Sequence, residues 1–200
     1  MIQAILFDLG KVLIHFNFEQ AFRRLSKHCR YSPQEIENFF IQSGLEVLYD
    51  GGKISSRSFY EKFKKALGLR LGFTTFERIW NGVFTPVPGM NRLVGQLEKR
   101  YRLVLISNTN AMHFSYALKH YPVLKKFDHY VLSYKEKVRK PDERIYRQAA
   151  KACRAKPREI FYIDDRADLT EAASELGFHT FTFRNNRSDL IRTLKKSRIL

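Results

Sequence analysis

The chain begins with a short apolar run, IQAILFDLG, at residues 2–10. Its β-branched and aromatic residues predict a buried β-strand over Ile2–Asp8, ending in a carboxylate. A carboxylate held away from water is costly unless something pairs with it. Gly10 follows two residues later and offers only its backbone. The run therefore raises two questions: what Asp8 does at the end of the strand, and why residue 10 has no side chain.

Composition indicates a globular protein with no membrane association. The 200 residues are 44% hydrophobic and 14% aromatic, enough for a packed core. No apolar run approaches the ~20 residues of a membrane span, and the first is too short for a signal peptide. Cys29 and Cys153 lie far apart, with no cysteine and histidine cluster at zinc spacing. We therefore expect a cytoplasmic protein.

Charge is the unusual bulk property. There are 36 Lys and Arg residues against 20 Asp and Glu, a net charge of +16 that attracts polyanions. No recognition helix, zinc finger or aromatic RNA-binding strand accompanies it, and a lysine-rich solvated surface explains the charge as well. Nucleic acid is therefore not a predicted partner, and no oligomeric state is predicted.

Most of the chain alternates predicted strands with helical patterns. The strands are expected at Ile2–Asp8, Arg102–Ser107, Tyr130–Ser133, Ile160–Asp164 and Thr180–Phe183. The helices are expected at Met90–Lys99, Ala111–Lys119, Asp142–Cys153, Ala167–Leu176 and Ser188–Lys195. This alternation is typical of an α/β fold with a parallel sheet covered by helices on both faces, a Rossmann-like three-layer core. In such sheets the chemistry lies beyond the carboxyl ends of the strands.

Residues 15–86 interrupt this alternation with helical patterns and almost no strand signal. Ser32-Pro33-Gln34-Glu35 predicts a capped helix start, and Thr74-Thr75-Phe76-Glu77 has capping-box spacing. Pro86-Val87-Pro88-Gly89 marks the end of the insert. We therefore expect a catalytic core of residues 1–14 and 87–200 and an all-helical cap of residues 15–86 inserted after the first strand.

Polar residues end three of the predicted strands: Asp8, then Ser107 with Asn108, then Asp164 with Asp165. Lys140 precedes a proline that opens a helix. Each has an ordinary explanation as a cap, a turn former or a solvated lysine. Together they predict a phosphoryl-transfer site, because Mg²⁺ relieves the repulsion between neighbouring carboxylates and neutralises the charge of a phosphate.

Each of these residues has an expected role in such a site. Asp8 would attack phosphorus in line and form an aspartyl-phosphate that water hydrolyses. Ser107 and the backbone amide of Asn108 would donate hydrogen bonds to the phosphoryl oxygens, and Lys140 would supply positive charge. Asp165 is expected to bind the metal directly, and Asp164 to support the metal site.

The chain resembles the haloacid dehalogenase superfamily of hydrolases. The four motifs of that family are matched in order by Asp8-Leu9-Gly10-Lys11-Val12, Ser107-Asn108, Lys140-Pro141 and Asp164-Asp165-Arg166. The segments ISNTN (106–110), RKPDERIY (139–146) and YIDDRADLTEAASELG (162–177) resemble most closely the subfamily IA phosphatases, whose helical C1 cap lies between motifs one and two. Bacterial sugar-phosphate phosphatases, including glucose-1-phosphate phosphatases, belong to that branch, and DGGKISSRSFYEKF (50–63) resembles its cap. The resemblance implies Mg²⁺-dependent hydrolysis of a small phosphorylated metabolite under a mobile cap.

Gly10 departs from the family pattern. Most family phosphatases carry at this position a second aspartate, which protonates the leaving oxygen. A glycine can still offer its carbonyl to the metal, so Gly10 stays a predicted metal ligand beside Asp8 and Asp165. The lost acid catalysis could be offset by a better leaving group, such as the anomeric oxygen of a sugar 1-phosphate, or by His15 or His113.

Two further positions depart from the pattern. Lys11 stands where relatives often have a small or amide-bearing residue, and it would either attract phosphate or point away. Leu169 stands where the fourth motif often has Asp or Asn, and the neighbouring Asp168 would face a different way on a helix. The Leu169 substitution predicts weaker Mg²⁺ binding.

Two other functions remain open from the sequence. A catalytically weak family member could bind a phosphorylated ligand or an acidic partner, which would agree with Gly10, Leu169 and the positive charge. A metal-independent 2-haloacid dehalogenase would also use an aspartate nucleophile. The Asp164-Asp165 pair argues against the dehalogenase, because paired acids are expected beside a cation.

Overall fold

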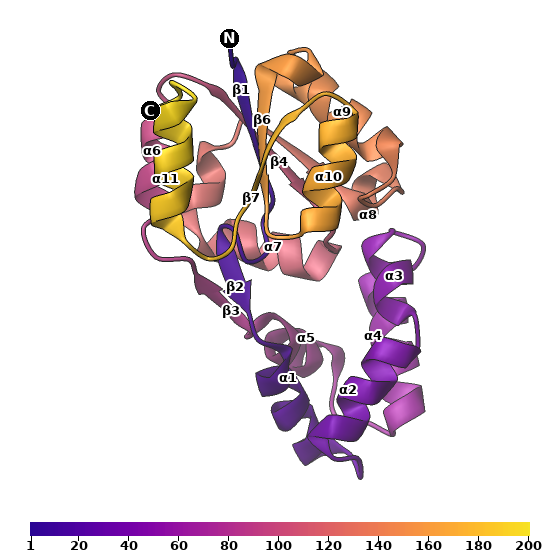
Figure 1. Cartoon of the computed structure of the whole chain (residues 1–200). Helices are drawn as coiled ribbons and strands as arrows, with labels where there is room; N and C mark the ends of the chain where they lie inside the picture. The colour runs from indigo at the N-terminus through magenta and orange to yellow at the C-terminus, as the bar shows by residue number, and fades with distance from the viewer.

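The protein is described by a computed structural model of residues 1–200, built around a five-stranded parallel sheet in the order β5-β4-β1-β6-β7 (Figure 1). The strands are β1 Ala4–Phe7, β4 Arg102–Ser107, β5 His129–Leu132, β6 Ile160–Asp164 and β7 His179–Thr182. All five strands expected from the sequence are present, with ends shifted by up to two residues. Strand β1 lies in the centre, paired with β4 on one side and β6 on the other. The predicted α/β class is confirmed.

The central strand is buried on both faces because its four residues are all apolar. Ile5 and Phe7 face one hydrophobic cluster, whereas Ala4 and Leu6 face another, as the two-residue period of a strand requires. None of the four has measurable solvent exposure. A strand that is buried on both faces needs an apolar residue at every position. This explains why polar and apolar residues do not alternate in β1.

Helices cover both faces of the sheet. One hydrophobic cluster packs α6 Met90–Leu97, α7 Ala111–His120 and α11 Arg187–Lys196 against the sheet. The other packs α9 Glu143–Cys153 and α10 Ala167–Glu175 against the opposite face. A short helix α8, Ser133–Glu136, follows β5, and 3₁₀ turns occur at η1 Ser26–His28, η2 Pro122–Lys126 and η3 Pro157–Glu159. The sheet between two helical layers is the three-layer core expected from the sequence. No helix in the chain combines the length and apolar character that a membrane span requires.

Five helices form a separate body beneath the sheet in Figure 1. They are α1 Phe18–Leu25, α2 Pro33–Gln42, α3 Leu45–Asp50, α4 Ser56–Leu67 and α5 Phe73–Asn81. Two short strands, β2 Ile14–Phe16 and β3 Phe84–Pro86, pair antiparallel where the chain leaves and re-enters the core. The sequence predicted no strands here, and that expectation was wrong because strands of three residues are too short to show a period.

Two helix starts predicted in this body had different outcomes. Ser32 and Glu35 form the expected capping box at the start of α2, with the Ser32 amide donating to Glu35 over 2.8 Å. Thr74 is not a cap: α5 begins at Phe73, and its N-cap residue is Gly72. The capping-box spacing at Thr74 was therefore misleading, since Thr74 and Thr75 already lie in the first turn.

The helical body has its own aromatic core. Phe18, Phe22, Phe40, Phe59, Phe63, Phe76 and Trp80 pack with ring centroids between 5.1 and 6.4 Å apart. All but one of the 17 buried residues in this cluster come from residues 21–83, and the exception is Met112 from α7. A core of this kind, drawn from one continuous segment, is typical of a unit that packs largely on its own.

Candidate active site

Lys140 lies at the centre of the predicted site. Its ammonium group donates to Asp8 Oδ1 over 2.7 Å and to Asp164 Oδ2 over 2.6 Å. It also contacts the Tyr162 hydroxyl at 3.2 Å and the Ile106 carbonyl at 3.4 Å. All three charged groups are buried. The ends of β1 and β6 and the loop before α9 therefore converge, as their positions in the sequence predict.

The two other residues predicted to contact phosphate lie at the end of β4. The side chain of Asn108 clamps the backbone of Lys140: its amide donates to the Lys140 carbonyl over 3.0 Å, and its oxygen accepts from the Lys140 amide over 2.8 Å. This leaves its own backbone amide as the group that can reach a ligand. Ser107 lines the same cleft as Asp8 and Lys140 and is buried.

Asp8, Asp164 and Asp165 form the one acidic cluster suited to a cation. One carboxylate oxygen from each lies within 4.8 Å of the others. Both oxygens of Asp164 have partners, since Oδ2 accepts from Lys140 and from the Tyr162 hydroxyl, and Oδ1 accepts from the Arg166 amide. The carboxylate of Asp165 has only Lys11, at 3.8 Å. Asp165 is therefore the freer ligand, which agrees with its expected direct role and with a supporting role for Asp164.

The charges of this cluster fit a divalent cation. Three carboxylates surround the single buried ammonium of Lys140, and carboxylate oxygens are the donors that Mg²⁺ prefers. The pKa of Asp8 is raised to about 7, chiefly by burial and also by Asp164 and Asp165, while Lys140 acts in the opposite direction. Burial and Asp164 also raise the pKa of Asp165. A bound cation would favour the ionised form of both carboxylates, which burial and the neighbouring negative charges disfavour.

Burial alone would lower the pKa of Lys140, but Asp8 and Asp164 together hold it above its ordinary value. The lysine therefore stays protonated. Tyr162, from β6, is held in its neutral form because burial and the nearby carboxylates raise its pKa well above 10. The sequence analysis missed Tyr162, although it lies two residues before Asp164 and so on the same face of the strand.

The departures found in the sequence have clear positions. Lys11 reaches toward Asp165 and lies over the Phe16 ring at 5.6 Å, so it belongs to the rim of the cleft. Leu169 is buried and lines the cleft, whereas Asp168 pairs with Arg166 in solvent. His15 lines a separate surface groove with Thr85 and Pro86, so it is not placed to act in the cleft.

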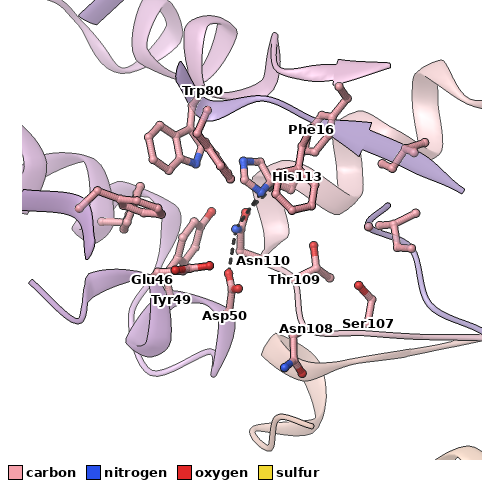
Figure 2. A pocket seen from close by; sticks show the side chains of 17 residues that line it. Phe16, Glu46, Tyr49, Asp50, Trp80, Ser107, Asn108, Thr109, Asn110 and His113 are labelled. Carbon is pink, nitrogen blue, oxygen red and sulfur yellow. Dashed lines mark hydrogen bonds between the residues drawn. The ribbon is translucent and has the colours of Figure 1, made fainter. Parts of the chain in front are cut away.

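A second cavity opens beside the cleft, between the helical body and the core (Figure 2). Glu46 and Asp50 from α3 line both spaces, as do Gly10, Phe16, Ser107 and Asn108. Phe40 and Tyr49 also line this cavity, whereas Phe39 and Arg57 do not. Arg139 lines only the catalytic side. The sequence analysis missed Glu46, Asp50 and Arg139.

Asp50 links the helical body to the core. Its Oδ1 accepts from Asn110 over 2.9 Å, and its backbone carbonyl accepts from Ser133 over 2.6 Å. Burial raises the pKa of Asp50 to about 6; the Asn110 hydrogen bond lowers it, Glu46 raises it and Arg139, 3.9 Å away, lowers it. The end of α3 is thus held against the core beside the catalytic cleft.

His113 lies in the second cavity and not beside Asp8. Burial lowers its pKa to about 3, against a smaller opposing effect of the Trp80 carbonyl, so the ring is neutral. It stacks on the indole of Trp80, with centroids 6.0 Å apart and planes at 12°. The ring therefore belongs to the aromatic wall of the cavity.

Comparison with known proteins shows the family to which this chain belongs. A family model described as haloacid dehalogenase-like hydrolase matches residues 2–177. D-ribitol-5-phosphate phosphatase of Bacteroides thetaiotaomicron is 27% identical over 193 residues, covering 92% of this chain and 93% of that protein.

Two solved structures show the same architecture. A HAD family enzyme from Bacteroides thetaiotaomicron, in complex with magnesium and inorganic phosphate, superposes with a TM-score of 0.86 at 28% identity, covering 95% of this chain and 99% of that one. A predicted HAD-like family hydrolase from Porphyromonas gingivalis superposes with a TM-score of 0.81 at 28% identity, covering 98% of each chain. This chain belongs to the haloacid dehalogenase-like hydrolases, as its motifs predicted.

Proposed function

We propose that this protein is a Mg²⁺-dependent phosphatase that hydrolyses a small phosphorylated metabolite, with sugar phosphates as the first candidates. The observation that carries the proposal is Lys140, held between Asp8 and Asp164 at 2.7 and 2.6 Å beside the free carboxylate of Asp165. Relatives named as a phosphatase and as a magnesium and phosphate complex support it.

Asp8 is the proposed nucleophile. Its oxygen attacks phosphorus, the bond from phosphorus to the leaving oxygen breaks, and the leaving oxygen takes a proton from solvent or from the substrate's surroundings. Water then attacks the aspartyl-phosphate and releases inorganic phosphate. Lys140 holds the attacking oxygen in place and balances charge, while Ser107 and the backbone amide of Asn108 donate to the phosphoryl oxygens.

The proposed metal ligands are Asp8, Asp165 and the Gly10 carbonyl, with Asp164 in support. When bound, Mg²⁺ neutralises the charge of the phosphate and fixes its orientation. The Arg166 amide and the Tyr162 hydroxyl keep Asp164 in place, so the chain itself positions the acidic cluster.

We further propose that residues 15–86 act as a cap that selects the substrate, over a catalytic core of residues 1–14 and 87–200. The separate aromatic core of the helices and the paired strands β2 and β3 support this division. We infer a cytoplasmic setting from the two free cysteines. We propose no nucleic-acid partner, because no recognition motif accompanies the positive charge.

A metal-dependent screen over phosphorylated metabolites tests the proposal, with Asp8→Asn as the matched control. We expect hydrolysis with Mg²⁺, none with EDTA, and a loss of at least about 10³-fold in Asp8→Asn. Full activity in that variant would remove Asp8 as nucleophile. Release of chloride from a 2-chloro acid in the presence of EDTA would instead identify a metal-independent dehalogenase. The cluster of three carboxylates argues against that function, because it suits a metal ion.

Gly10 favours one second candidate, a catalytically weak protein that binds a phosphorylated ligand. The side chain that would protonate the leaving group is absent, and general acid catalysis is typically worth about 10²- to 10⁴-fold. No turnover across the screen, together with thermal stabilisation by phosphate and Mg²⁺, would support this candidate.

A further inference from the structure

The second cavity carries a specific set of polar atoms. It adjoins the catalytic cleft and has a volume of about 100 Å³. Its walls include the rings of Phe18, Phe40, Phe59, Phe84 and Trp80. The space suits a fragment of a few carbon atoms attached to a phosphate in the cleft. A ligand there would be the leaving group of the proposed hydrolysis.

Trp80 points to a ligand with a hydrogen-bond acceptor. Its indole nitrogen is buried and has no partner in the chain, although an indole N–H can only donate. Figure 2 shows this nitrogen on the edge of the ring that faces the other labelled polar side chains. Buried donors are almost always satisfied, so a group supplied by a ligand is the expected partner.

His113 adds a weaker indication. Asn110 Oδ1 accepts a hydrogen bond from the backbone amide of His113. The other side-chain atom of Asn110, the donor Nδ2, lies 3.2 Å from His113 Nδ1, so Nδ1 is the acceptor of this second hydrogen bond. The proton of the neutral ring therefore lies on Nε2, which has no partner. The backbone carbonyl of Trp80 acts on the His113 ring and raises its pKa, so this carbonyl is itself near the ring nitrogens. The inference therefore rests on the indole nitrogen of Trp80 and not on His113.

Two carboxylates supply the acceptors. Glu46 and Asp50 are four residues apart on α3 and share one face of the helix. Asn110 occupies Asp50 Oδ1, and the nearest cation to Oδ2 is Arg139 at 3.9 Å, so Oδ2 can accept from a ligand. No lysine or arginine lines the cavity, so a leaving group with its own carboxylate or second phosphate would be repelled.

The geometry points to a subsite for a neutral, polyhydroxylated leaving group, with Trp80 and Asp50 as its specificity-determining residues. Hydroxyl groups of the ligand accept from the Trp80 nitrogen and donate to Asp50, and ring faces pack against the C–H groups of a sugar or polyol. An ammonium group would suit the aromatic walls and the two acids, but it would leave the Trp80 donor unpaired. The inference rests on the proposed phosphatase function and names its substrate class.

The first test uses binding alone. Trp80 is the only tryptophan in the chain, so its fluorescence reports directly on the cavity. We expect glycerol 3-phosphate or ribitol 5-phosphate, added with Mg²⁺ to the Asp8→Asn variant, to change this emission with saturation. Inorganic phosphate alone should change it little. An equal response to inorganic phosphate would overturn the subsite.

The second test uses Trp80→Phe, which keeps an aromatic ring and removes the N–H. We expect kcat/KM for polyol phosphates to fall about 3- to 10-fold, the loss of one hydrogen bond, with no change for methyl phosphate. The matched control is Tyr60→Phe, which removes a buried hydroxyl bonded to the Leu71 carbonyl in the same helical body but outside the cavity. It should leave the substrate preference unchanged.

A substrate panel separates the two levels of the proposal. The wild type should prefer polyol phosphates over 3-phosphoglycerate and phosphocholine, and Asp50→Asn should reduce the discrimination against 3-phosphoglycerate. Activity on 4-nitrophenyl phosphate without this preference, or an equal loss on every substrate in Trp80→Phe, would overturn the subsite and leave the phosphatase proposal standing. Absence of activity on every substrate would overturn the phosphatase proposal itself.

Discussion

Phe16 lies against Gly10, with its ring carbon Cε1 2.9 Å from the point that a β-carbon on residue 10 would occupy. Contacts that short essentially never occur for a real β-carbon, so no side chain fits there unless Phe16 moves. The ring thus fills the place where, by family resemblance, a second aspartate would begin. The contact is compatible with a glycine in the first motif, and Phe16, which is 37% exposed, is the side chain that a residue with a β-carbon would displace.

Restoring the aspartate should therefore require two changes. Gly10→Asp alone should gain no activity and should lose stability, because the new side chain meets the Phe16 ring. Gly10→Asp combined with Phe16→Ala should hydrolyse alkyl phosphates at least about tenfold faster than Phe16→Ala alone, since a general acid is restored. Steady-state kinetics of the four proteins measures this. A gain in the single Gly10→Asp variant would show that Phe16 is no obstacle.

Turnover should depend steeply on the acidity of the leaving group. Residue 10 supplies no proton to the leaving oxygen, so the bond to phosphorus breaks more slowly as the leaving group becomes more basic. Rates for a series of aryl and alkyl phosphates, plotted against the leaving-group pKa, should give a clearly negative slope. A flat series would mean that another group of the chain delivers the proton.

Lys140→Met should lower stability and make it depend on Mg²⁺. Removing one partner of a buried ion pair typically costs about 3–5 kcal/mol, and here it leaves Asp8 and Asp164 facing each other. Urea unfolding in EDTA should show this loss, and Mg²⁺ should raise Tm more in the variant than in the wild type.

Lys126→Met is the control for that measurement. Lys126 pairs with Glu98 at the surface over 2.5 Å, and such exposed pairs contribute only about 0–1 kcal/mol. It should unfold nearly as the wild type does, with the same response to Mg²⁺. Equal losses in the two variants would contradict the central place of Lys140.

His113 should make the protein sensitive to acid. Its pKa is lowered to about 3 by burial, against about 6.5 in an unfolded chain, so between these values the unfolded state binds the extra proton. The free energy of unfolding should therefore fall as the pH falls below 6.5, by about 1.4 kcal/mol per pH unit. Urea titrations from pH 4.5 to 6.5 should show a slope steeper by this amount in the wild type than in His113→Gln.

Asp50 acts in the opposite direction in the same experiment. Its raised pKa of about 6 means that the folded state takes up a proton first, which adds stability as the pH falls. Both proteins in the comparison contain Asp50, so only the difference between their slopes reports on His113. Identical slopes in the wild type and His113→Gln would show that the pKa of His113 is the same in the folded and unfolded states.

The core of the site could be predicted from sequence because strand ends carry it. Asp8, Ser107 and Asp164 each end a recognisable apolar strand, and the carboxyl ends of parallel strands meet at one edge of the sheet. Lys140 follows from the third motif, although the expectation that Pro141 opens the helix was wrong, because α9 begins at Glu143 with Asp142 as its N-cap. These contacts depend on topology, which the alternation of strands and helices already fixes.

The cap side of the site could not be predicted in the same way. Asp50 and Asn110 are 60 residues apart and come into contact only because α3 packs on the core. Neither local sequence contains a pattern that predicts this packing. The same is true of Trp80, whose burial follows from helical periodicity but whose unpartnered nitrogen does not. Strands β2 and β3 were missed because three residues do not establish a pattern.

The central position of β1 has a consequence for the order in which the protein is made. Residues 4–7 are synthesised before their hydrogen-bonded neighbours, which are residues 102–105 and 160–163. The helices of residues 18–81 make mostly nearby contacts and can collapse while synthesis continues. Asp8, the proposed nucleophile, therefore lacks its partners until β6 and the acidic pair at its end have been made, so a nascent chain that ends before Asp165 should have no working catalytic centre.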